Sequence, residues 1–325
     1  MPEHSYDRRP HVVAWVLLCA ALALIWVGGL VTTYDAGMAV PDWPNTFGHV
    51  LFLYPPGNWL SAPSEVWDLF LQQSHRLIAA CVGLLSVVLA AVLWRRDGRR
   101  WMKWLGLAAV AGVSLQGVLG GLRVIGDDIL LAGIHGCTGP LLFAFCAALV
   151  TFTSRRWQTA EVPGEHPAAR PLHWTALLLS GGVTLEIVLG APLRHVPASA
   201  SPGWFVLWVW LHLIVAGLVA AGIVWLLIYA ACRLPEQRKI VRLARLLGLL
   251  LAAELLLGAA AWVASFGVPE WFRDTVWAVG YTVVGQGRLR VWTRTAHAAF
   301  GPLCLAAAVS LTLWSLRLLR ARSAR

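Results

Sequence analysis

The chain has 325 residues, of which 58% are hydrophobic and only 13% are charged. A typical soluble domain carries about 25% charged residues, so a chain this apolar is expected to lie in a membrane. The composition excludes a disordered chain, collagen and a disulfide-linked secreted scaffold. The net charge is +10, but the basic residues fall mostly in short segments between apolar runs, without a soluble nucleic-acid-binding motif. Nucleic acid is therefore excluded as a partner.

The six cysteines all lie in apolar runs or at the ends of such runs. The sequence contains no Cys-x-x-Cys and no Cys-x-x-Cys-His, so neither covalent haem attachment nor a zinc framework is expected. We interpret the cysteines as small buried hydrophobic residues.

Eight segments are long and apolar enough to cross a membrane as helices. They are residues 12–34, 69–94, 101–123, 129–153, 172–193, 204–231, 243–266 and 291–317. The first apolar run is longer than the core of a signal peptide, so we expect it to be a true span. The sequence therefore predicts an all-α integral membrane protein with eight transmembrane helices.

The basic residues are distributed unequally between the two sides of the predicted spans. One side, which includes both termini, has 19 Lys and Arg residues, and the other side has six. Because basic residues accumulate on the cytoplasmic side, we expect a multi-pass protein of the cell (inner) membrane with both termini in the cytoplasm. In a eukaryote the corresponding place would be the mitochondrial inner membrane.

Two long connections are predicted on the opposite, outer side. Residues 35–68 contain no Lys or Arg but carry Trp43, Trp59 and Trp67, and residues 267–290 carry further aromatic residues. Tryptophan prefers the headgroup layer. The two connections are therefore either lids that lie along the membrane surface or parts of an ordinary aromatic belt.

An internal repeat relates the two halves of the chain. Both His135 and His297 begin the pattern His-x-x-x-Gly-Pro-Leu, and His75 and His212 occupy matching places in the spans two before them. This predicts two fused four-helix bundles related by an axis along the membrane normal. The expected units are an N-terminal half (residues 1–153), a linker (residues 154–171) and a C-terminal half (residues 172–325).

The four histidines lie six to eight residues from the outer end of their predicted spans, which is a depth of about 10 Å. Two histidines that face each other across a helix bundle can bind one metal with a planar macrocycle between them. We therefore predict His75, His135, His212 and His297 as iron ligands, with haem as the cofactor. The alternatives are zinc or copper, which usually recruit cysteine or carboxylate as well, and simple hydrogen bonding between helices.

Other polar residues inside the predicted spans are further candidates, because such residues are costly in a membrane. Arg76 follows His75, and its guanidinium is expected to pair with haem propionates or with the polar loop above it. Gln72 lies one turn before His75 on nearly the same face. Gln116, Glu186 and Glu254 are further buried candidates, and a structural hydrogen bond is the alternative role for the two glutamates.

These motifs together resemble the haem A synthase family, whose members oxidise haem O to haem A for cytochrome oxidase. The resemblance covers nearly the whole chain and rests on the eight spans, the four histidines and several short segments. These segments are Gly28-Gly29-Leu30-Val31-Thr32, Asp42-Trp43-Pro44, His75-Arg76, Leu115-Gln116-Gly117-Val118-Leu119-Gly120-Gly121 and His135-Gly136.

The resemblance implies an oxidoreductase with a resident haem b and with haem O as substrate. His212 and His297 would hold the haem b, and His75 and His135 would line the substrate site. The C8 methyl of the porphyrin would become a formyl group, with electrons relayed through the resident haem. Haem O synthase, and an electron donor such as quinol or ferredoxin, are the implied partners.

The chain departs from the family pattern at Gln72, where members commonly have Glu. Glutamine cannot transfer a proton, so either another group takes this role or the activity is altered. A non-catalytic b-type cytochrome with two bis-His haems, which passes electrons in the membrane, remains an alternative. A transporter is less compatible with the sequence, because transporter sites usually lie near the membrane midplane.

Overall fold

The computed structural model describes residues 6–61, 66–161, 163–197, 199–268, 283–284 and 287–321. These residues form eight helices that are long and apolar enough to cross a membrane. They are α1 (Arg9–Thr33), α3 (Trp67–Arg96), α4 (Arg100–Ile125), α5 (Ile129–Thr153), α7 (Ala169–Arg194), α8 (Pro202–Arg233), α9 (Arg238–Phe266) and α11 (Arg288–Leu318). The predicted all-α membrane class is confirmed, and each predicted span falls within one of these helices to within a residue.

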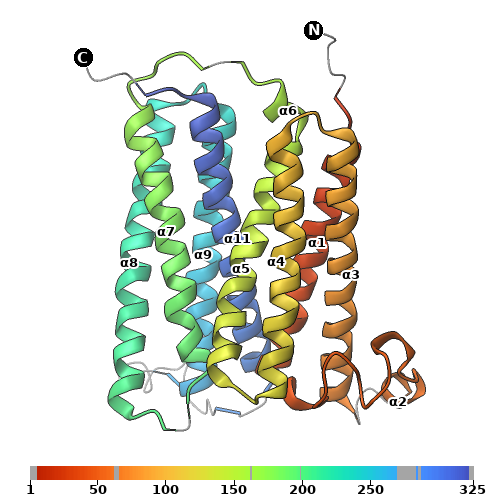
Figure 1. Ribbon diagram of the computed structural model, residues 1–325. Coiled ribbons are helices and arrows are strands. Elements are labelled where there is room, and N and C mark those ends of the chain that lie inside the picture. Colours follow the sequence, from red (N-terminus) through yellow and green to blue (C-terminus); the bar gives the residue numbers. More distant parts are fainter. Residues whose placement is uncertain are drawn as a thin grey trace.

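The long helices form two groups of four (Figure 1). In the first group, which we call the N-half, α1 contacts α3 and α5, and α4 contacts the same two helices. In the second group, the C-half, α7 contacts α8 and α11, and α9 contacts the same two helices. Short turns join α3 to α4, α4 to α5 and α8 to α9, so these neighbours run antiparallel. The origin of the two halves by duplication stays a prediction.

Helices α5 and α11, which carry the His-x-x-x-Gly-Pro-Leu pattern, lie in the middle of the molecule (Figure 1). They contact each other, and each also contacts a further helix of the other half. Phe143, Ala147 and Ala306 form a buried cluster between the halves, against which residues of α1 pack. The two predicted ligand helices that share this pattern are therefore held in one common core.

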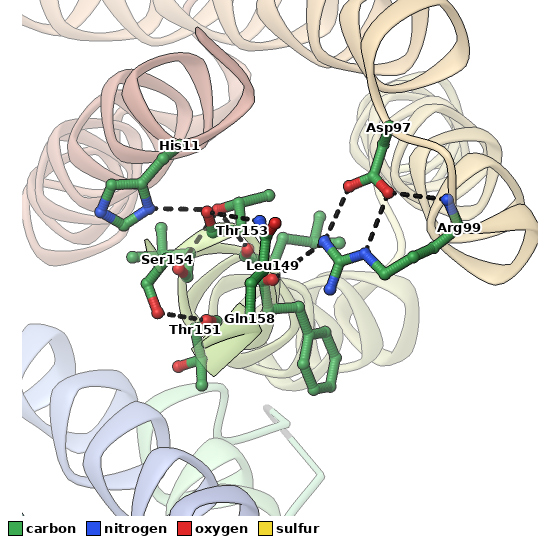
Figure 2. Close-up of polar contacts among 10 residues, drawn as sticks. His11, Asp97, Arg99, Leu149, Thr151, Thr153, Ser154 and Gln158 are labelled. Atoms are coloured by element: carbon green, nitrogen blue, oxygen red, sulfur yellow. Dashed lines mark hydrogen bonds and ion pairs between the residues drawn. The ribbon is translucent and has the colours of Figure 1, made fainter. Parts of the chain in front are cut away.

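The two ends of the helix bundle differ in what they carry. At the end where α1 begins and α11 ends, which we call the terminal end, polar side chains connect the helices (Figure 2). His11 Nδ1 lies 3.2 Å from Thr153 Oγ1, and Arg99 forms an ion pair with Asp97 and donates to the Phe152 carbonyl.

The opposite end, the loop end, carries the connection between α1 and α3. This connection includes the short helices η1 (Ala36–Met38), η2 (Leu51–Leu53) and α2 (Gly57–Leu60).

A polar contact also joins the two halves near the loop end. Arg194, the last residue of α7, donates to the Gly29 carbonyl of α1 at 2.6 Å and to Thr33 Oγ1 at 3.0 Å. Thr33 in turn lies 3.0 Å from Thr295 of α11. These bonds satisfy a cation that is costly to bury unpaired, and they fix α1 against the C-half.

Close helix packing within the N-half depends on Gly106. A Cβ atom at this position would lie 3.1 Å from the Ala90 Cα and from Leu93 Cδ1 of α3. We expect Gly106→Val to destabilise the protein by about 1–3 kcal/mol, because the added methyl groups force the helices apart. Thermal unfolding in detergent, followed by circular dichroism, measures this change.

Gly117→Val is the matched control. Gly117 lies in the same helix, but no atom is within 4 Å of the position of its Cβ. Equal melting temperatures for the two variants would contradict the proposed packing role.

Candidate functional site

Each of the four predicted histidine ligands packs against a glycine of the preceding long helix. The pairs are Gly28 with His75, Gly120 with His135, Gly190 with His212, and Gly258 with His297. A Cβ atom on these glycines would lie 2.8, 3.1, 3.5 and 3.1 Å, respectively, from the Cε1 atom of the imidazole. The missing side chain thus leaves space for each ring between two helices.

The structure brings His212 and His297 together in the C-half. Their ring centroids are 6.3 Å apart and their planes are inclined at 82°. Two imidazoles that share one metal through their Nε2 atoms, at about 2 Å each, hold their centroids about 6 Å apart. The observed separation would therefore allow both imidazoles to hold one iron.

A glutamate lies beside the other ring nitrogen of each C-half histidine. His297 Nδ1 is hydrogen-bonded to Glu254 Oε2 at 2.8 Å, and His212 Nδ1 forms an ion-pair contact with Glu186 Oε2 at 2.8 Å. A carboxylate at Nδ1 keeps the proton on that nitrogen and leaves the Nε2 lone pair free for a metal. The hydrogen bond between His297 and Glu254 therefore favours the tautomer that ligation requires. Glu186 lies at the same distance from His212 Nδ1 but forms no hydrogen bond with it, so it acts there by its charge.

The N-half pair lacks such carboxylates. Neither the Nδ1 atom of His75 nor that of His135 has a side-chain acceptor among the residues that the structure describes. Gln116, which occupies the position equivalent to Glu254, donates instead to Thr138 Oγ1. The two halves thus share the histidine–glycine packing but differ in the surroundings of the imidazoles.

Within the described ranges, no group of three or more His, Cys, Asp or Glu side chains could hold a metal ion. Each half instead offers two imidazoles. A metal ion with only two protein ligands needs further ligands from a bound molecule. A porphyrin would supply four nitrogen ligands. The donor set therefore fits haem better than a protein-ligated zinc or copper ion.

Gln72 fastens the loop between α1 and α3 to the helix that carries His75. Its Nε2 donates to the Gly37 carbonyl at 2.7 Å, and its Oε1 accepts from the Val40 N–H at 2.5 Å. Its side chain is buried. Both ends of the amide are therefore occupied by the backbone of the loop.

Arg76 makes similar contacts one turn further along α3. It donates to the carbonyls of Asn45 and Val40 at 2.8 and 2.9 Å. Of the two partners expected for its guanidinium, the structure thus places it on the polar loop. Its expected contact with a haem propionate stays a prediction.

The loop also reaches the helix beside His135. A Cβ atom at Gly121 would overlap the Trp43 indole, so this ring packs directly on the α4 backbone next to Gly120. Asp42 accepts hydrogen bonds from the N–H groups of Phe47 and Gly48, both at 2.8 Å. Burial alone would raise the pKa of Asp42, but these hydrogen bonds and the nearby Arg76 lower it, so the carboxylate is charged at neutral pH. The loop therefore packs on α3 and α4 of the N-half, and its place as a lid along the membrane surface stays a prediction.

Positive charge gathers between the halves at the loop end. Burial, followed by the charges of Arg194 and Arg123, lowers the pKa of His195 to about 4. His195 is therefore neutral at physiological pH, and the arginines supply the positive charge. Anionic groups of a ligand that extends towards this end would be attracted here.

Comparison with known proteins identifies the family. The family model COX15-CtaA, described as cytochrome oxidase assembly protein, matches residues 11–201. The chain belongs to the COX15-CtaA family.

Several relatives of this chain are named heme A synthase. The protein of Lysinibacillus sphaericus is 25% identical over 203 residues, which are 58% of this chain and 61% of the relative. That of Bacillus licheniformis is 25% identical over 246 residues, covering 69% and 77%. That of Listeria monocytogenes is 32% identical over 165 residues, covering 47% and 50%. The chain thus spans less than two thirds of the Lysinibacillus and Listeria proteins.

Two features of this COX15-CtaA member were not assigned from its sequence. The histidine–glycine packing was missed, although the glycines occupy matching places in the repeat. The contact between Glu186 and His212 was also missed, although Glu186 and Glu254 each lie four residues before the glycine that packs on a histidine.

The predicted outer cover of the C-half, residues 267–290, lies mostly outside the described residues.

The contacts of Gln72 predict a role in holding the loop. In Gln72→Met both hydrogen bonds are lost while the side-chain length is kept. We expect the Val40 amide hydrogen to exchange roughly tenfold faster or more, because an unmade buried hydrogen bond costs about 1–3 kcal/mol. Hydrogen–deuterium exchange with mass spectrometry measures this rate.

Gln158→Met is the control, since Gln158 bonds the Thr153 carbonyl at the terminal end and its loss should leave the loop unchanged. Unaltered exchange at Val40 in Gln72→Met would show that other contacts hold the loop.

Proposed function

We propose that the chain is a haem A synthase-like oxidoreductase that converts the C8 methyl of haem O to a formyl group. The observation that carries this proposal is the His212–His297 pair, with a centroid separation of 6.3 Å and a carboxylate at each Nδ1. Membership of a cytochrome oxidase assembly family, and relatives named heme A synthase, agree with it.

Each group of residues has a distinct role in this proposal. His212 and His297 would hold a resident haem b, and the porphyrin iron would supply the electron-transfer and oxidative chemistry. His75 and His135 would bind haem O in the N-half. The loop fastened by Gln72 and Arg76 would exclude water from this site on the loop-end side.

A non-catalytic b-type cytochrome is a second candidate, and Gln72 favours it. Both ends of its amide are engaged by the loop backbone, and an amide has no proton to transfer at neutral pH. If haem A is formed, another group must therefore move protons in the N-half.

The product distinguishes these two candidates. Cells that express the chain together with haem O synthase should contain extractable haem A, and the purified protein should have a low-spin bis-imidazole spectrum. His212→Ala should lose this spectrum wholly or largely, because it removes one of the two imidazoles that would hold the iron. Liquid chromatography of extracted haem and visible spectroscopy are the measurements.

His173→Ala is the matched control, because His173 lies in the C-half but bonds the Ser315 carbonyl near the terminal end. Haem b retained in both halves without haem A would favour the cytochrome. An unchanged spectrum in His212→Ala would contradict the assignment of the resident site.

We further propose that the protein lies in the inner membrane with the terminal end in the cytoplasm, since 19 of the basic residues lie on that side. A green fluorescent protein fused to the C-terminus should then fluoresce, and an alkaline phosphatase fused there should be inactive. Active phosphatase would reverse the orientation. Haem O synthase, and quinol or ferredoxin as electron donor, are the proposed partners.

A further inference from the structure

The two halves place different side chains at one equivalent position. This position lies four residues before the glycine that packs on each histidine. It holds Glu186 and Glu254 in the C-half, and Leu24 and Gln116 in the N-half. Both glutamates lie 2.8 Å from a histidine Nδ1, whereas Gln116 is bonded to Thr138.

The two glutamates are largely buried, so their charges interact strongly with neighbouring groups. Their side chains are only 15% and 16% exposed, and charges in such a medium interact more strongly than in water. Gly301 of the repeated pattern makes room for Glu254, since a Cβ atom there would lie 3.2 Å from Glu254 Oε1. The matching Gly139 in the N-half has no atom within 4 Å of its Cβ position.

A carboxylate bonded to a ligating histidine changes the electronic properties of the metal. It raises the basicity of the imidazole and adds negative charge near the iron, and hydrogen bonding to ligands is one of the means by which proteins set haem potentials. Both effects stabilise ferric iron more than ferrous iron. An iron between His212 and His297 would therefore be easier to oxidise than one beside His75 and His135.

We propose that Glu254 and Glu186 are positioning residues that lower the reduction potential of the C-half haem below that of the N-half group. This inference rests on the proposed bis-His haem b in the C-half and deepens it, because it gives the direction of electron transfer. In this arrangement ferrous iron held by His212 and His297 would become ferric, and the electron would reduce ferric iron of the porphyrin held by His75 and His135 to ferrous iron. The external donor proposed above restores the ferrous state.

The test is a spectroelectrochemical titration of the purified protein loaded with haem b. Glu254→Gln keeps the size of the side chain and removes its charge. We expect a retained low-spin spectrum and a ferrous:ferric ratio at fixed potential that rises about tenfold, which for one electron is a positive shift of about 59 mV. Glu254→Asp keeps the charge and should stay closer to the wild-type protein.

Gln116→Leu is the control in the equivalent N-half position and should leave the C-half potential unchanged. A low-spin haem with an unaltered potential in both Glu254→Gln and Glu186→Gln would overturn the inference, although the resident haem would stand. Loss of haem from both variants would also overturn it, because the glutamates would then serve retention. A wild-type protein without low-spin haem would instead refute the proposed function.

Discussion

The close approach of an imidazole ring to a helix backbone without a side chain is the constraint on which the rest of the structure depends. Each of the four predicted histidine ligands makes such an approach, always to a glycine of the preceding long helix. Small residues permit such approaches in membrane proteins, where little hydrophobic driving force acts between helices. The ring that enters the space is polar, and the groups that lie beside its Nδ1 atom differ between the two halves.

The two halves use their costly buried polar groups differently. In the C-half, Glu186 and Glu254 are directed to the imidazoles themselves. In the N-half, Gln72 and Arg76 hold the loop, and Gln116 bonds to Thr138. One scaffold therefore places carboxylates beside the imidazoles of the C-half, and in the N-half it uses polar residues mainly to hold the loop. A permanent cofactor suits the first arrangement, and a substrate that enters and leaves suits the second.

The helices could be predicted because the length of an apolar run is fixed by membrane thickness. The pairing of His212 with His297 could be anticipated for a related reason, since matching depths on like-directed helices follow from counting residues. The contact between Glu186 and His212 could not, because it depends on how each helix is rotated about its axis. The role of Gln72 could not be predicted either, because its partners are backbone groups of an irregular loop. The positions of such groups do not follow from a periodic sequence pattern.

The family assignment and the C-half geometry are independent of each other. The matched family region ends at residue 201, before α8 begins at Pro202, so it contains neither His212 nor His297. Yet these histidines have the more complete arrangement, with a glycine, a carboxylate and a facing imidazole for each ring. A bundle that merely stabilised the matched N-half would have no need of two buried glutamates, which cost free energy unless they are paired. Each of them lies 2.8 Å from a histidine Nδ1, which agrees with the metal centre proposed for the C-half.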